Sequence, residues 1–413
     1  MESERTGIIM DAKAVGNTIA ALRRRAGMTQ SALATALNIS DKAVSRWESG
    51  LGFPEVTQFP ALAALFGVSV DYLMTGERKG IVLAGNILTD TVKNIESYPE
   101  IGMLSSITSV SQAVGGCVPN TAIDIAKIDR SVPLTAIGCV GNDAAGRYVT
   151  EQMQNHGINT EHVTILADVP TSFSDVMSLP SGERTFFHAR GANARFSPEH
   201  IDMSALNGNM LHIGYILLLD EFDKEDAEYG TVMARFLHDV QERGICTSID
   251  VVSDNDGNYK KTIVPALKYC NYAVMNEIEC CSIDGFEACD ENGRPIVENI
   301  RAAMEKIAAY GVKDKVIVHC KQAGFCLDVA SGAFTVVPSL KIPAEEIRGS
   351  VGAGDAYCAG CLYGLYNGYA DEELLRFASA AAACNLFADN SVDGMRPKNE
   401  ILKMEEKYGR LTL

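Results

Sequence analysis

From residue 81 onward, short β-rich runs alternate with helical stretches, and this alternation restricts the possible fold more than any other feature. The runs are "IVLAGNI", "LTAIGCVG", "MLHIGYILL", "ICTSIDVV", "YAVMN" and "VIVHC". Such alternation predicts an α/β fold with a mainly parallel sheet and helices on both faces. In folds of this class, ligands bind at the carboxyl ends of the strands. The residues that follow each run are therefore the first candidates for function.

The chain is long enough for two or three domains, and its charge changes at about residue 80. Of its 413 residues, 47% are hydrophobic, which is ample for a large core. The first 80 residues hold nine Lys and Arg against eight Asp and Glu, whereas the rest carries a net charge of −18. With a net charge of −17, the chain as a whole repels nucleic acid and anionic membranes. The first 80 residues are thus electrostatically a separate part.

The cysteines are typical of free thiols in a reducing, cytoplasmic environment. All 12 lie beyond residue 80 at irregular spacing. The one C-x-x-C, Cys358 and Cys361, has no second pair and is more typical of small buried helix residues than of a metal site. None of the seven histidines pairs at metal-ligand spacing. No targeting segment and no apolar run of membrane-spanning length occur, so we expect a cytoplasmic protein without a membrane partner.

Five short helices are predicted within the first 80 residues. Thr29, Ser40 and Ser69 are placed to cap the second, third and fifth helices, and Pro60 fits the first turn of the fourth. A tight turn separates the second helix from the third. This is a helix-turn-helix arrangement. We expect this domain over residues 11–76.

The segments "LRRRAGMTQSALATALNIS" and "DKAVSRWESG" resemble the XRE/lambda-repressor type of DNA-binding domain. The resemblance implies that the third helix enters the major groove of operator DNA, while the arginines at 23–25 meet phosphates. The residues expected to contact DNA are Gln30, Asp41, Lys42, Ser45 and Arg46. Because the domain is nearly neutral, one copy should bind weakly, which favours a dimer. A small protein-interaction module is the alternative.

The stretch "GSVGAGDAYCAG", residues 349–360, predicts a helix start that attracts anions yet carries a carboxylate. Gly352, Ala353 and Gly354 open the helix, where free backbone N–H groups and the helix dipole favour negative charge. Asp355 stands directly after them. No P-loop motif offers another phosphate site. A simple capping Asp is the alternative interpretation.

Residues 80 to about 405 resemble the ribokinase-like (PfkB) carbohydrate kinase family. The matching motifs occur in order: Asp90, "GG" at 115–116 with Asn120, "GCVGNDAAG" at 138–146, the N-x-x-E of Asn276 and Glu279, and "GAGD" at 352–355. The resemblance implies a ribokinase-like domain over 81–413, after a linker at 77–80. Its small β lid is expected at approximately 88–117 and 171–190. The implied reaction is ATP-dependent phosphorylation of a hydroxyl on a sugar or nucleoside, and the lid often mediates homodimers in this family.

The resemblance also implies roles for individual residues. Asp355 would be the base for the attacking hydroxyl, and Gly352, Ala353 and Gly354 would bind the transferring phosphoryl group. The implied substrate-binding residues are Asp90, Gly115, Gly116 and Asn120. The implied nucleotide-binding residues are Asn276, Glu279, Lys321, Gly324 and Ser379. Glu279 would hold Mg²⁺, bound with ATP, through water.

Several positions depart from the family pattern. Gly349 stands where the family often has an Asp that helps bind a monovalent cation, which argues against potassium activation. Lys321 replaces a usual Gly, Asp250 begins "DVV" in place of D-P-N, and Ser379 lies in a changed adenine-side segment. Because the base, the anion hole and N-x-x-E are retained, a working kinase fused to a transcriptional regulator is favoured. The alternative is a sugar-sensing regulator with a weak or inactive kinase domain.

Overall fold

The protein is described by a computed structural model covering residues 11–413, except residues 67, 69, 76–78, 181–182, 204–205, 207 and 253–258. The chain forms two compact units, Met1–Lys79 and Gly80–Leu413. The part of the predicted linker at 77–78 lies outside the described residues. Where the chain is described, every helix is too short or too polar to cross a membrane.

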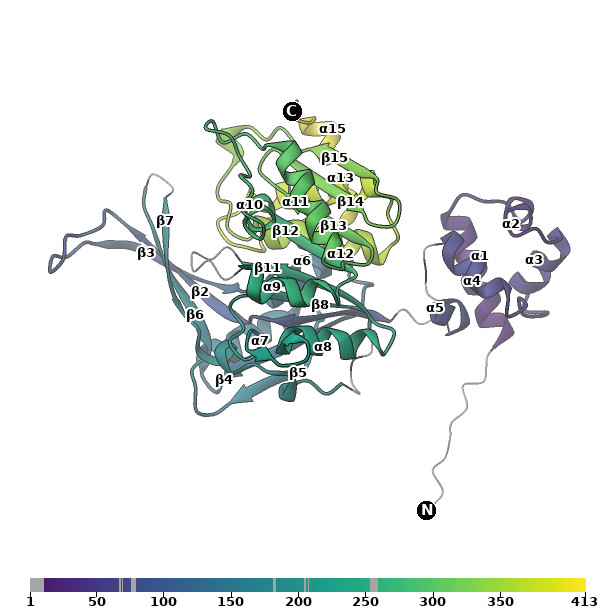
Figure 1. The fold of residues 1–413 in the computed structure, drawn as a ribbon, viewed down its shortest axis with the longest axis horizontal. Helices are drawn as coiled ribbons and strands as arrows, with labels where there is room; N and C mark the ends of the chain where they lie inside the picture. Colours follow the sequence, from purple (N-terminus) through teal and green to yellow (C-terminus); the bar gives the residue numbers. More distant parts are fainter. Residues whose placement is uncertain are drawn as a thin grey trace, which may run out of the picture. The chain divides into compact units, whose positions relative to one another are not determined.

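The N-terminal unit is made of five helices (Figure 1). They are α1 Ala12–Arg25, α2 Gln30–Ala36, α3 Asp41–Glu48, α4 Gln58–Phe66 and α5 Val70–Thr75. The side chain of Thr29 accepts a hydrogen bond from the backbone N–H of Ala32, and Ser40 does the same for Ala43, so both predicted caps are confirmed. The predicted cap Ser69 lies outside the described residues. The helices enclose a core that includes Val15, Ile19, Leu33, Val44, Trp47 and Leu62.

The second unit is built on a nine-stranded sheet in the order β15-β14-β13-β12-β11-β8-β1-β4-β5. The parallel strands are β1 Gly80–Gly85, β4 Leu134–Gly141, β5 Asn159–Leu166, β8 Gly208–Ile216, β11 Cys246–Val251, β12 Tyr272–Asn276 and β13 Lys315–His319. The remaining two, β14 Ala323–Asp328 and β15 Phe334–Pro338, lie at one edge, where β14 pairs antiparallel with both β13 and β15. The predicted mainly parallel sheet is confirmed, with a hairpin added at its edge.

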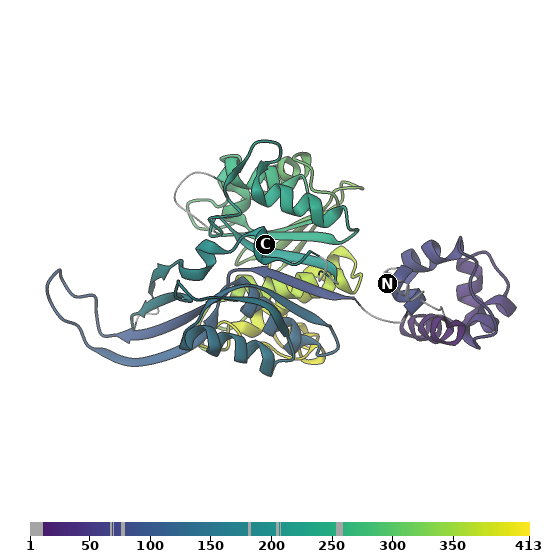
Figure 2. The same cartoon turned by 90° about the horizontal axis from the view of Figure 1, so that it is seen from below.

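Helices cover both faces of this sheet (Figure 2). Strand β1 shows why: Ile81 and Leu83 pack into one core with α6, α12 and α13, whereas Val82 and Ala84 pack into another with α8, α9 and α11. The helices of the unit are α6 Cys117–Ile128, α7 Ala144–Asn155, α8 Val232–Gln241, α9 Tyr259–Leu267, α10 Glu277–Ser282, α11 Val297–Ala309, α12 Ala353–Tyr366, α13 Asp371–Asn385, α14 Lys398–Ile401 and α15 Met404–Tyr408. The sheet is buried on both sides, as its continuous apolar runs require.

A second sheet of four strands, in the order β3-β2-β6-β7, extends from this body (Figure 1). Its strands are β2 Leu88–Ile95, β3 Ile107–Gly115, β6 Ser172–Ser178 and β7 Arg184–Ala189. We call this sheet the lid. Residues 181–182, between β6 and β7, lie outside the described residues. Exposed apolar residues of the lid include Ile107, Val110, Phe173, Phe186 and Phe187.

Candidate active site

The start of α12 has the geometry of an anion-binding helix terminus. Gly352 caps the helix with a positive φ of 77°, a conformation that favours glycine. A Cβ on Gly352 would also lie 2.5 Å from the side chain of Ser391, so no larger residue fits. Asp355 lies in the first turn and is buried. The backbone N–H of Ala353 donates to the carbonyl oxygen of Ser350 at 3.2 Å, so this part of the predicted anion hole is already occupied. The buried carboxylate of Asp355 lies beside any phosphoryl group that binds at this helix start.

The carboxylate of Asp355 is held by side chains from two other elements. The amide of Asn120, on α6, donates to Oδ2 at 2.8 Å. The hydroxyl of Tyr215, on β8, lies 3.0 and 3.1 Å from Oδ1 and Oδ2. Burial raises the pKa of Asp355 to about 6, although the hydrogen bonds from Asn120 and Tyr215 act in the opposite direction. A carboxylate with this pKa is ionised at neutral pH. Its pKa is also close enough to neutral pH for it to accept a proton readily.

Around Asp90, on β2, the lid meets the body of the unit. Burial raises the pKa of Asp90 to about 7, and a hydrogen bond from Ser174 opposes this shift. A Cβ on Gly115 would lie 2.5 Å from Oδ2 of Asp90, and one on Gly116 would lie 2.5 Å from the carbonyl oxygen of Asn86. The "GG" pair therefore lets the backbone approach Asp90 and Asn86 closely.

Three buried asparagines in this region have amide atoms without a hydrogen-bond partner among the described residues. These are both amide atoms of Asn86, Oδ1 of Asn120 and Nδ2 of Asn193. The side-chain oxygen Oδ1 of Asn193 accepts a hydrogen bond from the backbone N–H of Ile87, which ties Asn193 to the segment after β1. Buried polar groups are nearly always paired, so these atoms indicate a polar ligand. Asn86 is absent from the sequence predictions, and the signal that points to it is its place directly after the first strand.

On the other side of Asp355, a cavity of about 230 Å³ lies at the carboxyl ends of the strands. Its lining includes Asn276, Glu279, Gly352, Gly354, Asp355, Tyr215, Asp250, His319 and Cys358. Asn276 and Glu279 form a reciprocal capping box, with both hydrogen bonds at 2.8 Å, so each fixes the other at the start of α10. Burial lowers the pKa of His319 to about 4, so this histidine is neutral.

Lys321, Gly324 and Ser379 are not among the residues that line this cavity, although the sequence predicts them at the nucleotide. Gly324 lies within β14, where a Cβ would come 2.2 Å from the hydroxyl of Tyr357. Ser379, on α13, accepts a hydrogen bond of 2.9 Å from the guanidinium of Arg410. Lys321 is exposed in the turn before β14. Gly324 pairs with His319, which lines the cavity, so it lies in the strand next to the cavity wall. The nucleotide-binding roles of Lys321, Gly324 and Ser379 stay predictions.

In the N-terminal unit, α3 presents the predicted DNA-contact residues on its outer face. Asp41, Lys42, Ser45 and Arg46 are exposed, while Val44 and Trp47 of the same helix are buried. The helix therefore offers a polar face opposite the one that packs into the core.

Two other predicted DNA-contact residues of this unit, Arg23 and Gln30, both bind Glu48. Arg23 is buried and binds both carboxylate oxygens of Glu48, at 2.6 and 2.8 Å, and the carbonyl oxygen of Met28 at 2.7 Å. The expectation that Arg23 meets phosphate is wrong, because its guanidinium joins α1 to α3. The side-chain amide of Gln30 donates to Glu48 at 2.8 Å. Gln30 lies half-buried at the start of α2. Arg24 is exposed.

Solved structures with this fold confirm the ribokinase-like fold class. The ribokinase of Thermotoga maritima superposes with a TM-score of 0.65 at 19% identity, covering 79% of this chain and 99% of that one. The Arabidopsis thaliana ribokinase complexed with ribose and ATP gives a TM-score of 0.66 at 22% identity, with the same coverage. At these identities the likeness establishes the fold alone.

Curated relatives and family models agree with the fold. The Arabidopsis thaliana ribokinase is 26% identical over 328 residues, 78% of this chain and 80% of the relative. A 5-dehydro-2-deoxygluconokinase of Listeria innocua is 23% identical over 294 residues, 70% of this chain and 86% of the relative. The pfkB family carbohydrate kinase model matches residues 79–397, and a helix-turn-helix model matches residues 19–73. The chain therefore belongs to the pfkB family of carbohydrate kinases and carries a helix-turn-helix domain ahead of its kinase domain.

Proposed function

We propose that this kinase domain transfers the terminal phosphoryl group of Mg-ATP to a hydroxyl of a sugar or nucleoside, with Asp355 as the base. One observation carries the proposal: Asp355 is hydrogen-bonded to Asn120 on the side of Asp90 and also lines the cavity that holds Asn276 and Glu279. A base for phosphoryl transfer must lie between acceptor and donor in this way.

The chemistry follows from the positions of these groups. The acceptor hydroxyl hydrogen-bonds to the carboxylate of Asp355 and passes its proton there as its oxygen attacks the phosphorus atom. Backbone N–H groups at Gly352 and Gly354 stabilise the charge on the phosphoryl oxygens. The unpaired amide atoms of Asn86 fix other hydroxyl groups of the acceptor.

The donor set of the cavity fits Mg²⁺. The carboxylates of Asp250 and Glu279 both line it, and carboxylate oxygen is a ligand that Mg²⁺ prefers, often through water. Glu279 is the residue we assign to the ion. When bound with ATP, Mg²⁺ supplies positive charge that offsets the negative charge of the phosphates.

Arg184 supports an anionic contact beneath the lid. A second cavity, of about 750 Å³, lies between lid residues that include Asn94 and Arg184 and the segment 347–352 before α12. Nη1 of Arg184 is buried and lacks a hydrogen-bond partner among the described residues. A Cβ on Gly349 would lie 3.3 Å from Nη2 of Arg184, so the guanidinium lies against the segment that leads to the anion hole. We assign Arg184 to an anionic group of the bound ligand.

For the N-terminal domain, we propose binding to operator DNA through the outer face of α3, as a homodimer. The exposed side chains of Lys42 and Arg46 supply positive charge and hydrogen-bond donors on that face. Because the two domains share one chain, we further propose that sugar occupancy changes the affinity for DNA. This coupling requires the sugar to bind the two DNA-affinity states with different free energies.

The kinase proposal is tested by ADP release from Mg-ATP with a panel of pentoses, hexoses, ketoses, sugar acids and nucleosides. We expect one acceptor class to be turned over by the wild type, with turnover collapsing in Asp355→Asn. If no compound is turned over while one of them still raises the thermal unfolding temperature, the sugar-sensing alternative replaces the kinase proposal.

The DNA proposal is tested by selecting bound sequences from random DNA and measuring their affinity as a function of salt. Substituting Lys42 or Arg46 by Ala should weaken binding, while Lys13→Ala on α1 is the matched control. Affinity that does not depend on salt would favour the protein-interaction alternative. Equal affinity with and without the identified sugar would refute the coupling.

A further inference from the structure

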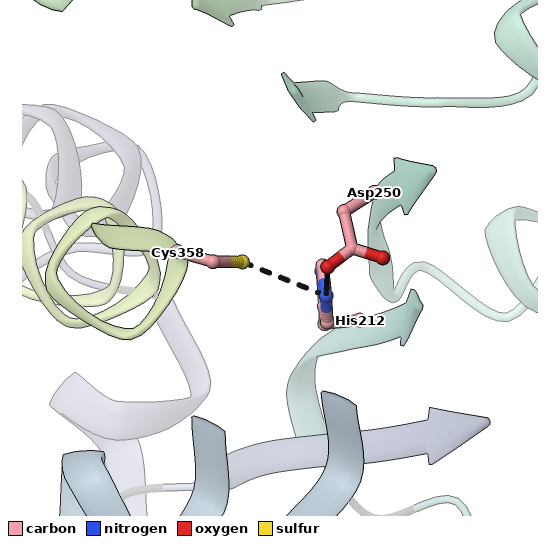
Figure 3. Close-up of side chains that lie close together, drawn as sticks. All are labelled: His212, Asp250 and Cys358. Carbon is pink, nitrogen blue, oxygen red and sulfur yellow. Dashed lines mark hydrogen bonds and ion pairs between the residues drawn. The ribbon is translucent and has the colours of Figure 1, made fainter. Parts of the chain in front are cut away.

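Three side chains from distant parts of the sequence meet in the interior of the kinase domain: His212 on β8, Asp250 on β11 and Cys358 on α12 (Figure 3). Nε2 of His212 lies 3.6 Å from Sγ of Cys358 and 3.6 Å from Oδ2 of Asp250. All three donor atoms lie within 4.8 Å of one another, and all three residues are buried. The sequence alone gives no metal-ligand spacing among these residues, because they come from three separate elements.

The two separations from Nε2 of His212 match those of ligands around a tetrahedral Zn²⁺ ion. Zinc binds histidine nitrogen at about 2.0–2.1 Å, thiolate sulfur at about 2.3 Å and carboxylate oxygen at about 2.0–2.2 Å. Tetrahedral bonds of those lengths hold neighbouring donor atoms about 3.3–3.6 Å apart. Both distances from Nε2 of His212 agree with this range to within a few tenths of an ångström.

The surroundings orient two of the three donors toward a common point. The hydroxyl of Ser248 lies 3.0 Å from Nδ1 of His212, which leaves Nε2 to face Cys358 and Asp250. The backbone N–H of Tyr215 donates to Oδ1 of Asp250 at 2.6 Å, which leaves Oδ2 on the side of His212. Hydrogen bonds of this kind, behind the ligands, fix the orientation of metal-binding histidines and carboxylates.

The charge of the adjoining cavity also favours a cation. Asp250 and Cys358 line this cavity together with Glu279 and Asp355, and no Lys or Arg occurs among its described lining residues. A site with three protein ligands and one side open to a cavity is the arrangement in which zinc keeps a fourth position for water or another ligand.

We propose that His212, Asp250 and Cys358 bind one Zn²⁺ ion, with the fourth position of the ion facing the cavity. Binding replaces the thiol proton of Cys358, which is released to solvent, so no oxidant or reductant takes part. Thiolate and imidazole select zinc over Mg²⁺, which prefers oxygen ligands alone. The three zinc ligands do not include Glu279, the residue assigned to the Mg²⁺ of Mg-ATP, although both sites adjoin the same cavity and Asp250 lines it.

A consequence is that zinc inhibits the kinase, because the ion lies in the wall of the cavity that we assign to the nucleotide. This consequence rests on the proposed function, whereas the binding itself rests on the geometry of the three ligands. The two are therefore measured separately.

Binding is measured on the reduced, full-length protein after removal of metals with a chelator. Zn²⁺ is titrated calorimetrically, and Co²⁺ is used as a spectroscopic probe that reports a thiolate ligand through its charge-transfer absorption. We expect one equivalent of either ion per chain, unchanged by excess Mg²⁺. The matched control is Cys361→Ser, since Cys361 is equally buried on α12 but is not a member of the cluster.

Cys358→Ser should abolish the charge-transfer band, and His212→Asn should weaken Zn²⁺ binding by at least about tenfold. Ser248→Ala, which keeps all three ligands, should weaken it by about tenfold. Absence of stoichiometric binding to the wild type would overturn the proposal, as would equal binding by Cys358→Ser and Cys361→Ser. If either ligand variant fails to unfold cooperatively, the Ser248→Ala comparison decides. A wild type that binds Zn²⁺ yet turns over no acceptor would contradict the proposed function and leave the metal site standing.

Discussion

The two sides of Asp355 differ in how much of the binding site the folded chain already provides. On the side of Asp90, two tightly packed glycines lie near buried amides that lack hydrogen-bond partners among the described residues. On the side of Glu279, the structure offers an open cavity in which only a few predicted nucleotide residues lie. The acceptor side is therefore preorganised for its ligand. Binding on the nucleotide side depends on the helix start at α12 and on the metal ion that ATP brings.

The largest expected effect comes from removing the group that joins the two sides. Asp355→Asn keeps the size of the side chain and its contact with Asn120, but it cannot accept the proton of the hydroxyl. We expect kcat to fall by about 10²–10⁴-fold, with the KM for both substrates changing little. Steady-state kinetics with the acceptor found in the panel measures this. A fall confined to KM would show that Asp355 binds substrate without acting as the base.

The two sides are separated by a pair of matched truncations. Asn86→Ala removes amide atoms that have no hydrogen-bond partner in the described part of the chain. We therefore expect it to raise the KM for the acceptor by about 10–100-fold and to leave the KM for ATP unchanged. Asn276→Ala removes the N-cap of α10 and should raise the KM for ATP instead. Kinetics with each substrate varied in turn gives both values. Equal changes in both KM values for either variant would contradict the separation.

Arg184 tests whether the lid adds an anionic contact to the acceptor side. Arg184→Met keeps the length of the chain and removes the charge. If the ligand group is a carboxylate of the acceptor, the variant should lose about tenfold in kcat/KM for sugar acids and little for neutral sugars. If the group is the transferred phosphoryl, kcat should fall for every acceptor. An unchanged kcat/KM for all acceptors would remove Arg184 from the site.

The pH dependence should reveal how Asp355 is held. Because burial raises its pKa to about 6, kcat should fall as the pH drops through about 6 and the base becomes protonated. Tyr215→Phe removes a hydrogen bond that lowers this pKa, so the acid limb should move to higher pH by up to about one unit. The profile of kcat against pH measures the shift. A purely structural effect of Tyr215 would lower kcat without moving the limb.

The sequence predicts the fold because the fold depends on local patterns. Strand and helix alternation is read within a few residues, and the glycines before Asp355 predict an anion-binding helix start, although a simple capping Asp fits the same residues. The role of Asp355 as the base is implied by the resemblance to the family. The positions of residues at the edge of the sheet are harder to predict from the sequence. The roles of Gly324 and Ser379 are implied only by the resemblance to the family. Gly324 lies in the antiparallel edge hairpin, Ser379 lies on α13, and neither lines the cavity beside Asp355.

Contacts between distant residues are the part that spacing does not predict. Arg23 looks like one of three surface arginines, and only its distance from Glu48 shows that it joins two helices. His212 and Cys358 are separated by 146 positions, so their approach depends on how β8 and α12 pack. In each case the role of the side chain depends on a partner that is distant in sequence and close only in the folded chain. Sequence spacing does not identify that partner.

The smallest effect concerns the free energy of unfolding. It compares the cost of burying the charge of Asp90, on the acceptor side, with that of burying the charge of Asp355. The folded-state pKa values of Asp355 and Asp90, about 6 and about 7, lie above the ordinary value for an aspartate. The folded state therefore binds more protons than the unfolded state between the ordinary and the raised pKa, and stability falls as the pH rises through that interval. Above it, each buried carboxylate is ionised and destabilising.

Asp355→Asn should accordingly raise the free energy of unfolding by about 1–3 kcal/mol near pH 8, because the uncharged amide avoids the cost of burying a charge. The gain should shrink toward about pH 5, where the wild-type carboxyl is mostly protonated in the folded state. Asp90→Asn should behave in the same way with its transition nearer pH 7. Denaturant unfolding of the ligand-free protein at both pH values measures these gains. A gain that is independent of pH would mean that packing, and not the buried charge, sets the stability of this site.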